Sequence, residues 1–208
     1  MNNEPIIENG IIAGNVYPKY DTRNPIARVL TDGYLKALDR LVDSIAPTSI
    51  HEIGCGEGYL ISRFANGKRT LAGSDFSIQV IQKARSLWGS LDISFHVGSV
   101  YELTPQKDSA QLVLCCEVME HLESPERALD KLVGIADPYL ITSVPREPLW
   151  RMLNILRGKY LTQLGNTPGH LQHWSKSAFS RLLETRFDVL RVETPLPWTM
   201  VLCRLRRK

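Results

Sequence analysis

The sequence predicts an α/β protein built on a doubly wound, mostly parallel seven-stranded sheet with an antiparallel C-terminal hairpin strand. Three observations support this class. Apolar runs rich in β-branched residues alternate with helical patterns, a glycine-rich turn follows the first apolar run, and a short Pro-rich turn joins the last two strands. We expect one domain over 1–208, with a lid over about 1–45 and a substrate-side insertion over about 145–174.

The elements follow one another in the order typical of a parallel sheet with helical crossovers. Strands are expected at 48–53, 70–75, 93–97, 111–116, 138–144, 187–193 and 198–205. Helices are expected at 29–45, 57–66, 77–88, 124–135 and 176–185. The turn Pro195-Leu196-Pro197 separates the last two strands and predicts the hairpin.

Composition is that of an ordinary soluble domain. The 208 residues suffice for one packed core, with 43% hydrophobic and 23% charged residues. No apolar run approaches the roughly 18 to 20 residues that span a bilayer, and Met1–Glu4 does not begin a signal peptide pattern. We therefore expect a cytoplasmic protein. A net charge of +3 is a weak footprint for nucleic acid, which we do not expect as a partner; the basic tail 204–208 leaves that alternative open.

The turn after the first strand is the most informative feature of the chain. It reads Glu52-x-Gly54-x-Gly56-x-Gly58, with Cys55 between the first two glycines. Closely spaced glycines let the backbone turn tightly and approach a ligand. A dinucleotide site has the spacing Gly-x-Gly-x-x-Gly and aims a helix at a pyrophosphate. An acid two residues before the first glycine instead favours a nucleoside that carries an amino acid.

This motif resembles the first motif of the class I S-adenosylmethionine-dependent methyltransferases, whose Rossmann-like fold and cofactor it implies. Asp75 ends the second strand about twenty residues beyond the glycines, where nucleoside-binding folds place a carboxylate on the ribose, and Phe76 follows it. As an alternative, Asp75 caps the next helix, although Ser77 can take that role. The resemblance implies adenine contacts for Ser99 and Val100, although Ser99 stands where the family often has Asp; a plain strand-end turn is the alternative.

The exit of the fourth strand, residues 116–122, resembles the Glu-x-x-Glu-His segment of the small-molecule branch of that family, which includes the ubiquinone and menaquinone methylases. The resemblance implies that Glu117 lies over the methionine side of the cofactor, with Glu120 and His121 at the rim on the substrate side. Base methylases carry a Pro-rich signature here, which this chain lacks. As an alternative, Glu120 and His121 are solvated helix residues.

Two segments outside the core are expected to determine the substrate. The polar and aromatic stretch around Tyr20 is interpreted as a lid, with an ordinary N-terminal coil as the alternative. The insertion begins near Arg146, a candidate for binding an anionic group, and Trp150 opens a helical pattern over 149–161. From 148 through 183 the chain has five Lys or Arg and no acid, which suits a membrane surface. A lid packed on its own domain is the alternative.

The insertion loosely resembles that of the ubiquinone-biosynthesis O-methyltransferases, with a Gly-His element at Gly169-His170. His170 and His173 are the candidate general bases, because imidazole titrates near pH 6.5. Hydrogen bonding or helix capping is the alternative for each. We expect no metal, since His170 and His173 have no third ligand at a persuasive spacing. The four cysteines are expected to be buried and reduced.

We therefore expect a methyltransferase that uses S-adenosyl-L-methionine and methylates a small-molecule or lipid-like acceptor, with oxygen as the expected nucleophile and nitrogen and carbon as open alternatives. A noncatalytic protein that binds the same nucleoside stays open. A nicotinamide-dependent oxidoreductase fits less well because the glycine spacing is wrong and no hydride-site pair stands out. The acceptor and the oligomeric state do not follow from the sequence.

Overall fold

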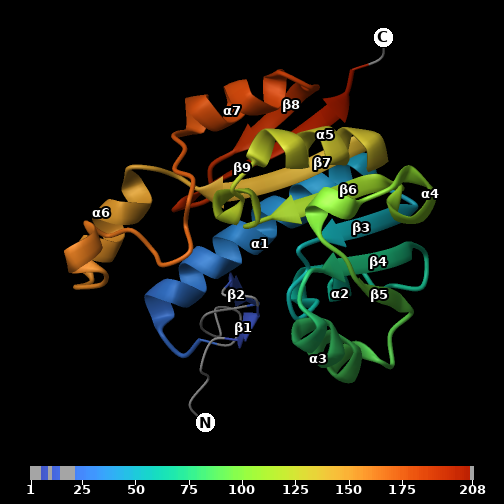
Figure 1. The fold of residues 1–208 in the computed structure, drawn as a ribbon, viewed down its shortest axis with the longest axis horizontal. Coiled ribbons are helices and arrows are strands. Elements are labelled where there is room, and N and C mark those ends of the chain that lie inside the picture. The colour runs from blue at the N-terminus through green and yellow to red at the C-terminus, as the bar shows by residue number, and fades with distance from the viewer. Residues whose placement is uncertain (1–5, 9–10, 15–21, 207–208) are drawn as a thin grey trace.

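A seven-stranded sheet forms the centre of the molecule (Figure 1). The structure, a computed structural model, describes residues 6–8, 11–14 and 22–206. The strands lie in the order β5-β4-β3-β6-β7-β9-β8. They are β3 (Ser49–Ile53), β4 (Thr70–Asp75), β5 (Ile93–Val97), β6 (Ala110–Cys116), β7 (Ala136–Pro145), β8 (Phe187–Glu193) and β9 (Trp198–Leu205). Within this sheet β9 runs antiparallel to both β7 and β8, and the other neighbouring strands are parallel, so the predicted fold class is confirmed.

Helices cover both faces of the sheet (Figure 1). They are α1 (Pro25–Ile45), α2 (Tyr59–Ser62), α3 (Ile78–Trp88), α4 (Pro105–Asp108), α5 (Pro125–Ile135), α6 (Leu149–Leu156) and α7 (Lys176–Glu184). One core cluster joins α1, α2 and α3 to the sheet, and a second joins α5 and α7 to the other face. Each fully buried Leu or Phe contributes about 1.5–3 kcal/mol to the free energy of folding, so these two clusters hold the helices firmly on the two faces of the sheet.

Helix α1 shows how the sequence produces this packing. Its buried residues recur at helical spacing from Thr31 to Val42, which puts one apolar stripe against the sheet. Asn24 caps its start by accepting hydrogen bonds from the amides of Ile26 and Ala27 at 2.9 and 3.2 Å. The helix begins four residues before the expected 29–45, because this cap lies outside the apolar pattern.

The other differences from the sequence prediction lie where backbone turns interrupt a helical pattern. Helix α2 is much shorter than the expected 57–66, because Gly58 before it is left-handed and the chain turns again at Gly67. The pattern over 149–161 ends as a helix at Leu156, just before left-handed Gly158. The hairpin of β1 (Ile6–Glu8) and β2 (Ile11–Ala13) was not predicted.

The strand order reverses between β3 and β6, which are adjacent and parallel. In open α/β sheets the carboxyl ends of the strands at such a reversal bind ligands. The glycine turn follows β3 and the segment from Glu117 follows β6, so both lie at this point. Within the described ranges no helix is long and apolar enough to span a bilayer.

Candidate functional site

The glycine turn has the backbone geometry that its sequence predicts. Gly54, Gly56 and Gly58 have φ of 68°, 53° and 78°, which is the left-handed region that favours glycine. A Cβ at Gly54 would collide with Val118, and one at Gly58 would lie 2.7 Å from the Phe95 ring. The turn therefore packs too closely on its neighbours for any other residue at these two positions.

Asp75 ties this turn to the next helix. Its two carboxylate oxygens accept hydrogen bonds from the amides of Gly56 and Ser77, each at 3.0 Å. Ser77 caps α3 by accepting from the Val80 amide at 3.2 Å, so Asp75 is not needed as the cap. Burial raises the pKa of Asp75. Each carboxylate oxygen retains lone-pair capacity for a further donor, such as a sugar hydroxyl.

Glu52 and Cys55 lie beneath the turn. The buried Glu52 carboxylate accepts from the Ile61 amide at 2.9 Å, which fastens α2 to β3. The Cys55 amide donates to the Ser74 carbonyl at 2.9 Å, and burial raises the pKa of the Cys55 thiol well above its usual range. Both residues adjoin the turn, as expected from their spacing, and a role for Glu52 toward an amino group stays a prediction.

The residues expected beside an adenine lie next to Asp75. The Gly98 amide donates to the Asp75 carbonyl at 2.9 Å, which brings the end of β5 against that of β4. Ser99 accepts from the Tyr101 amide at 3.3 Å, and Val100 is buried. Phe76 is half-buried. The structure thus gathers Asp75, Ser99 and Val100 at one end of the sheet edge.

Glu117 occupies the other end of this edge in a strained backbone conformation. Its φ is 60°, which is uncommon for a residue with a side chain and is typical of functional sites. The Glu117 carboxylate accepts hydrogen bonds from Trp198 Nε1 at 2.6 Å and Ser143 Oγ at 3.1 Å. The Ser143 hydroxyl also lies 2.8 Å from that of Tyr34. Three elements therefore fix the direction of this carboxylate.

A row of aromatic rings extends from Glu117 into the insertion. Ring centroids are separated by 5.1 Å from Tyr34 to Trp198, 5.8 Å from Trp198 to Trp150, 6.0 Å from Trp150 to His170 and 4.9 Å from His170 to His121. Aromatic pairs at such distances in tilted or offset geometry are favourable. We call these five residues the aromatic row.

The insertion is fastened to the segment after β6. The Glu120 carbonyl accepts from the amides of Leu171 and Gln172 at 2.8 and 2.9 Å. His121 Nδ1 donates to the Gly169 carbonyl at 2.9 Å, which leaves His121 Nε2 as the nitrogen with the lone pair in the neutral ring. The ligand atoms of Glu120, His121 and His170 lie within 4.8 Å of one another and have the donor types of a divalent cation site.

The two predicted bases have different surroundings. His170 is buried in the aromatic row, and burial together with the neighbouring His121 and His173 lowers the pKa of His170 to about 3. The ring is therefore neutral at physiological pH and a weak base. His173 is exposed, and its Nε2 lies 2.7 Å from Asn166 Oδ1.

The remaining predicted residues are less central. Trp150 donates from Nε1 to Thr167 Oγ1 at 2.9 Å, which braces α6 against the insertion loop. Arg146 pairs with Trp174 through an isolated backbone bridge and has a half-buried side chain. Tyr20 lies outside the described residues.

Part of the N-terminal segment reaches the glycine turn. Glu8 accepts from the Ser77 hydroxyl at 2.6 Å and the Ile78 amide at 3.3 Å. A Cβ at Gly56 would come within 3.9 Å of the Gly14 Cα. Residues 8 and 14 therefore lie against the same two elements that Asp75 joins.

Sequence reasoning missed Tyr34, Ser143 and Trp198. Tyr34 and Trp198 read as core positions of a helix and a strand, which their burial bears out. Nothing in their local pattern indicates that they meet Glu117. Only the position of β9 beside β7 brings Trp198 to the edge where Glu117 emerges.

Comparisons with known proteins agree with this geometry. Residues 50–138 match the methyltransferase domain family. The chain is 24% identical over 150 residues to a ubiquinone biosynthesis O-methyltransferase of Coxiella burnetii, covering 64% of this chain and 63% of that protein. It is 26% identical over 145 residues to the enzyme of that name from Alkalilimnicola ehrlichii, covering 62% and 59%. The match thus spans about three fifths of the length of these relatives.

Solved structures share the fold. Magnesium protoporphyrin IX methyltransferase from Synechocystis PCC 6803 with bound SAH superposes with a TM-score of 0.68 at 18% identity, covering 89% of both chains. The N-methyltransferase NodS from Bradyrhizobium japonicum WM9 superposes with a TM-score of 0.65 at 16% identity, covering 86% of this chain and 98% of the other.

Proposed function

We propose that this chain is a class I S-adenosylmethionine-dependent methyltransferase that methylates an oxygen of a small aromatic or lipid-like acceptor. One observation carries the proposal: the glycine turn and the aromatic row meet at Glu117. Val118 packs against Gly54 on one side, and Glu117 is bonded to Trp198 on the other. A nucleoside held by the turn therefore adjoins the aromatic row, in which Trp150 and His121 are partly exposed and could contact a flat, apolar acceptor.

The residues at the turn fit S-adenosyl-L-methionine. The close packing of Gly54 and Gly58 leaves backbone rather than side chains at the edge, and Asp75 has capacity for ribose hydroxyls. Ser99 and Val100 would hold the adenine, and Glu117 would face the methionine part. When bound, this cofactor supplies an activated methyl group together with its leaving group.

The chain's own contribution is alignment and acceptance of one proton. An aromatic acceptor stacked on Trp150 would place its oxygen near the imidazoles of His121 and His170. His170 and His173 remain the candidate bases; the lowered pKa of His170 makes it available at neutral pH but weak. Oxygen is proposed as the nucleophile because the relatives are named O-methyltransferases.

The N-terminal part, about 1–45, was expected to be a lid; because α1 packs in the core, we propose that only the stretch before α1 covers the cofactor. The hydrogen bonds of Glu8 to the start of α3 and the approach of Gly14 to Gly56 support it. The insertion, about 145–174, forms the acceptor side of the same domain.

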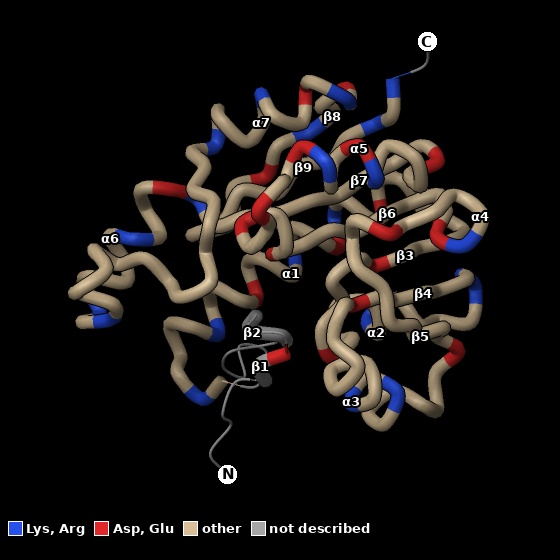
Figure 2. The backbone as a smooth tube through the Cα atoms, viewed as in Figure 1, with Lys and Arg blue, Asp and Glu red and all other residues tan. Residues whose placement is uncertain are grey.

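The insertion also supports contact with a membrane surface. Apolar side chains on it are exposed, among them Leu156 at 80% and Leu164 at 72%. Figure 2 shows basic residues along α6 and the turn after it, and no acid occurs between 148 and 183. Apolar side chains flanked by cations suit an anionic membrane interface. We propose a cytoplasmic protein that associates with a membrane through 149–161.

Methyl transfer from labelled S-adenosylmethionine to a catechol with a short prenyl chain tests the proposal. We expect turnover with the intact chain and at least a tenfold loss in kcat/KM when Trp150 is replaced by Ala, with Trp174→Ala as the matched control outside the row. If the chain binds S-adenosylhomocysteine but methylates none of a set of phenols, sugars and amines, the noncatalytic alternative would be favoured. Flotation with anionic vesicles, compared with a Leu156→Glu, Leu161→Glu chain, tests the membrane contact; equal flotation of both would contradict it.

A further inference from the structure

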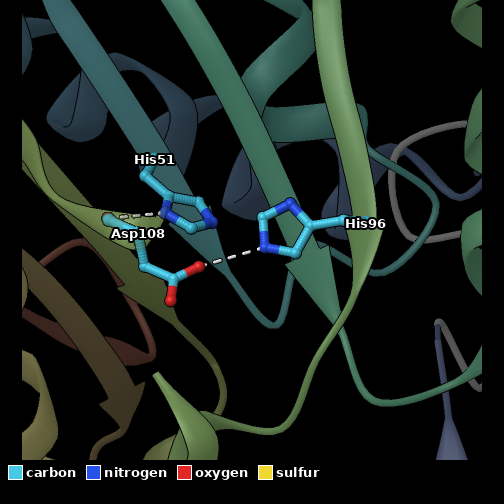
Figure 3. Close-up of side chains that lie close together, drawn as sticks. All are labelled: His51, His96 and Asp108. Carbon is cyan, nitrogen blue, oxygen red and sulfur yellow. Dashed lines mark hydrogen bonds and ion pairs between the residues drawn. The ribbon is translucent and has the colours of Figure 1, made fainter. Parts of the chain in front are cut away.

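A second group of ligand-type side chains lies on the sheet face covered by α5 and away from the aromatic row. His51 is in β3, His96 in β5 and Asp108 at the end of α4, and Figure 3 shows the three converging. His51 and Ile53 point to the same face because strand residues alternate, and Ile53 belongs to the α5 core cluster. One ligand atom of each residue lies within 4.8 Å of the others.

Hydrogen bonds orient His51 as a metal ligand would be oriented. Its Nδ1 lies 2.8 Å from the Asp108 carbonyl oxygen (Figure 3). A carbonyl only accepts, so Nδ1 carries the proton and the neutral ring keeps its lone pair on Nε2. That nitrogen accepts from the Ser74 hydroxyl at 3.1 Å. A backbone carbonyl that holds the other ring N–H is the usual second contact of a metal-bound histidine.

Asp108 and His96 complete the set. Asp108 Oδ2 accepts from the Thr104 amide at 2.8 Å, which turns Oδ1 toward His96 Nε2 at 3.1 Å. Two ligands of a tetrahedral zinc ion, each at about 2.0–2.1 Å, are separated by about 3.3 Å. The His96–Asp108 pair is already close to that separation, and all three ligand atoms lie within 4.8 Å of one another, so side-chain rotations are enough to close the site around an ion.

We propose that His51 Nε2, His96 Nε2 and Asp108 Oδ1 form a site for Zn²⁺ or a similar divalent transition metal. Two imidazole nitrogens and one carboxylate oxygen suit such transition metals, whereas Mg²⁺ and Ca²⁺ prefer oxygen ligands alone. The His96 side chain is 19% exposed whereas that of Asp108 is 4% exposed, so the ion enters from the His96 side and water supplies the fourth ligand. Binding breaks the Ser74–His51 hydrogen bond, so that the Nε2 lone pair of His51 binds the ion. His96 changes tautomer, its proton passing through solvent from Nε2 to Nδ1, and no redox step is involved.

The ion would fasten β3, β5 and α4 to one another beneath the cofactor edge. His51 is three residues before Gly54, and His96 is three residues before Ser99. A bound ion would therefore support the two loops that are proposed to hold the nucleoside. The site differs from the Glu120, His121 and His170 group, which lies beside the acceptor surface.

Zinc binding by the metal-stripped intact chain tests the site. We expect the stripped chain to bind one Zn²⁺ at this site. Its thermal unfolding midpoint should rise by about 5–10 °C when the Zn²⁺ concentration is a hundredfold above the Kd. His96→Gln, at a half-buried position, should weaken binding at least tenfold and abolish the shift at that zinc concentration. His121→Gln is the matched control, which removes a ligand-type side chain of the other group and should leave both results unchanged.

Three results would overturn the proposal: no saturable zinc binding by the intact chain, equal binding by His96→Gln, or a loss confined to His121→Gln. Co²⁺ provides a second measurement on the intact chain, because tetrahedral Co²⁺ with nitrogen and oxygen ligands absorbs visible light much more strongly than the octahedral ion. A spectrum of the octahedral type would equally contradict the site.

Discussion

Replacing Trp198 by Phe removes a hydrogen bond to Glu117 and keeps an aromatic ring in the row. The bond from Trp198 Nε1 to the Glu117 carboxylate is 2.6 Å long, and Trp198 is buried. Hydrogen bonds to charged groups contribute about 1.5–3 kcal/mol. Because Ser143 still donates to Glu117, we take the lower end, about 1.5 kcal/mol. If this loss falls on the ligand complex, affinity drops about tenfold.

Calorimetric titration with S-adenosylhomocysteine measures this change, and urea unfolding measures the accompanying loss of stability. Trp174→Phe is the matched control, since Trp174 packs against Phe179 in the other core layer. A double-mutant cycle with Glu117→Gln separates the hydrogen bond from the lost ring volume, with an expected coupling of about 0.5–3 kcal/mol. Unchanged affinity in Trp198→Phe, or a coupling near zero, would refute the view that this contact directs Glu117 toward the cofactor.

Three further results are expected. Gly58→Ala should lower the free energy of unfolding by well over the ~1–2 kcal/mol cost of a left-handed alanine, because the new Cβ would lie 2.7 Å from the Phe95 ring. Gly67 is also left-handed but has open space around it, so Gly67→Ala should lose only that cost. Equal losses of the two variants in urea unfolding would contradict the close packing at Gly58. The pKa of His170 is lowered from 6.5 to about 3, so between these pH values the unfolded chain binds a proton that the folded chain does not. The free energy of unfolding therefore falls as the pH drops from 6.5 toward 3, by about 2 kcal/mol at pH 5. His170→Asn should flatten this part of the pH profile measured by urea unfolding, and an unchanged profile would show that His170 does not cause it. Burial raises the pKa of Cys116 and Cys203 to about 12, so both thiols should resist a disulfide reagent at pH 8 until the chain unfolds, and fast labelling of the native chain would show that they are accessible.

The sheet could be predicted closely from the sequence because its strands are short apolar runs bounded by glycine, proline or polar residues. The expected ranges 70–75 and 93–97 match β4 and β5 residue for residue. The position of Asp75 beside the glycine turn could be predicted because the interval between them is set by one helix and one strand. Helix ends were less predictable: left-handed glycines such as Gly58 and Gly158 override the apolar period around them.

The proposed acceptor side could be predicted only in part. Trp150 and His170 were chosen because they lie in the insertion, but the row that joins them also needs Tyr34 from α1 and Trp198 from β9. These contacts depend on the order of strands across the sheet, which local patterns do not encode. The same holds for His51, His96 and Asp108, which come from separate segments and meet only once β3, β4 and β5 are paired.

Binding of S-adenosylhomocysteine to the intact chain and to Asp75→Asn tests the central claim most directly. The amide nitrogen donates where a carboxylate oxygen accepted, so it opposes the amide of either Gly56 or Ser77 and weakens the pairing with ribose hydroxyls. We predict saturable one-to-one binding by the intact chain and at least a tenfold weaker affinity in the variant. No binding by the intact chain, or the same affinity in both, would contradict a nucleoside site at this turn.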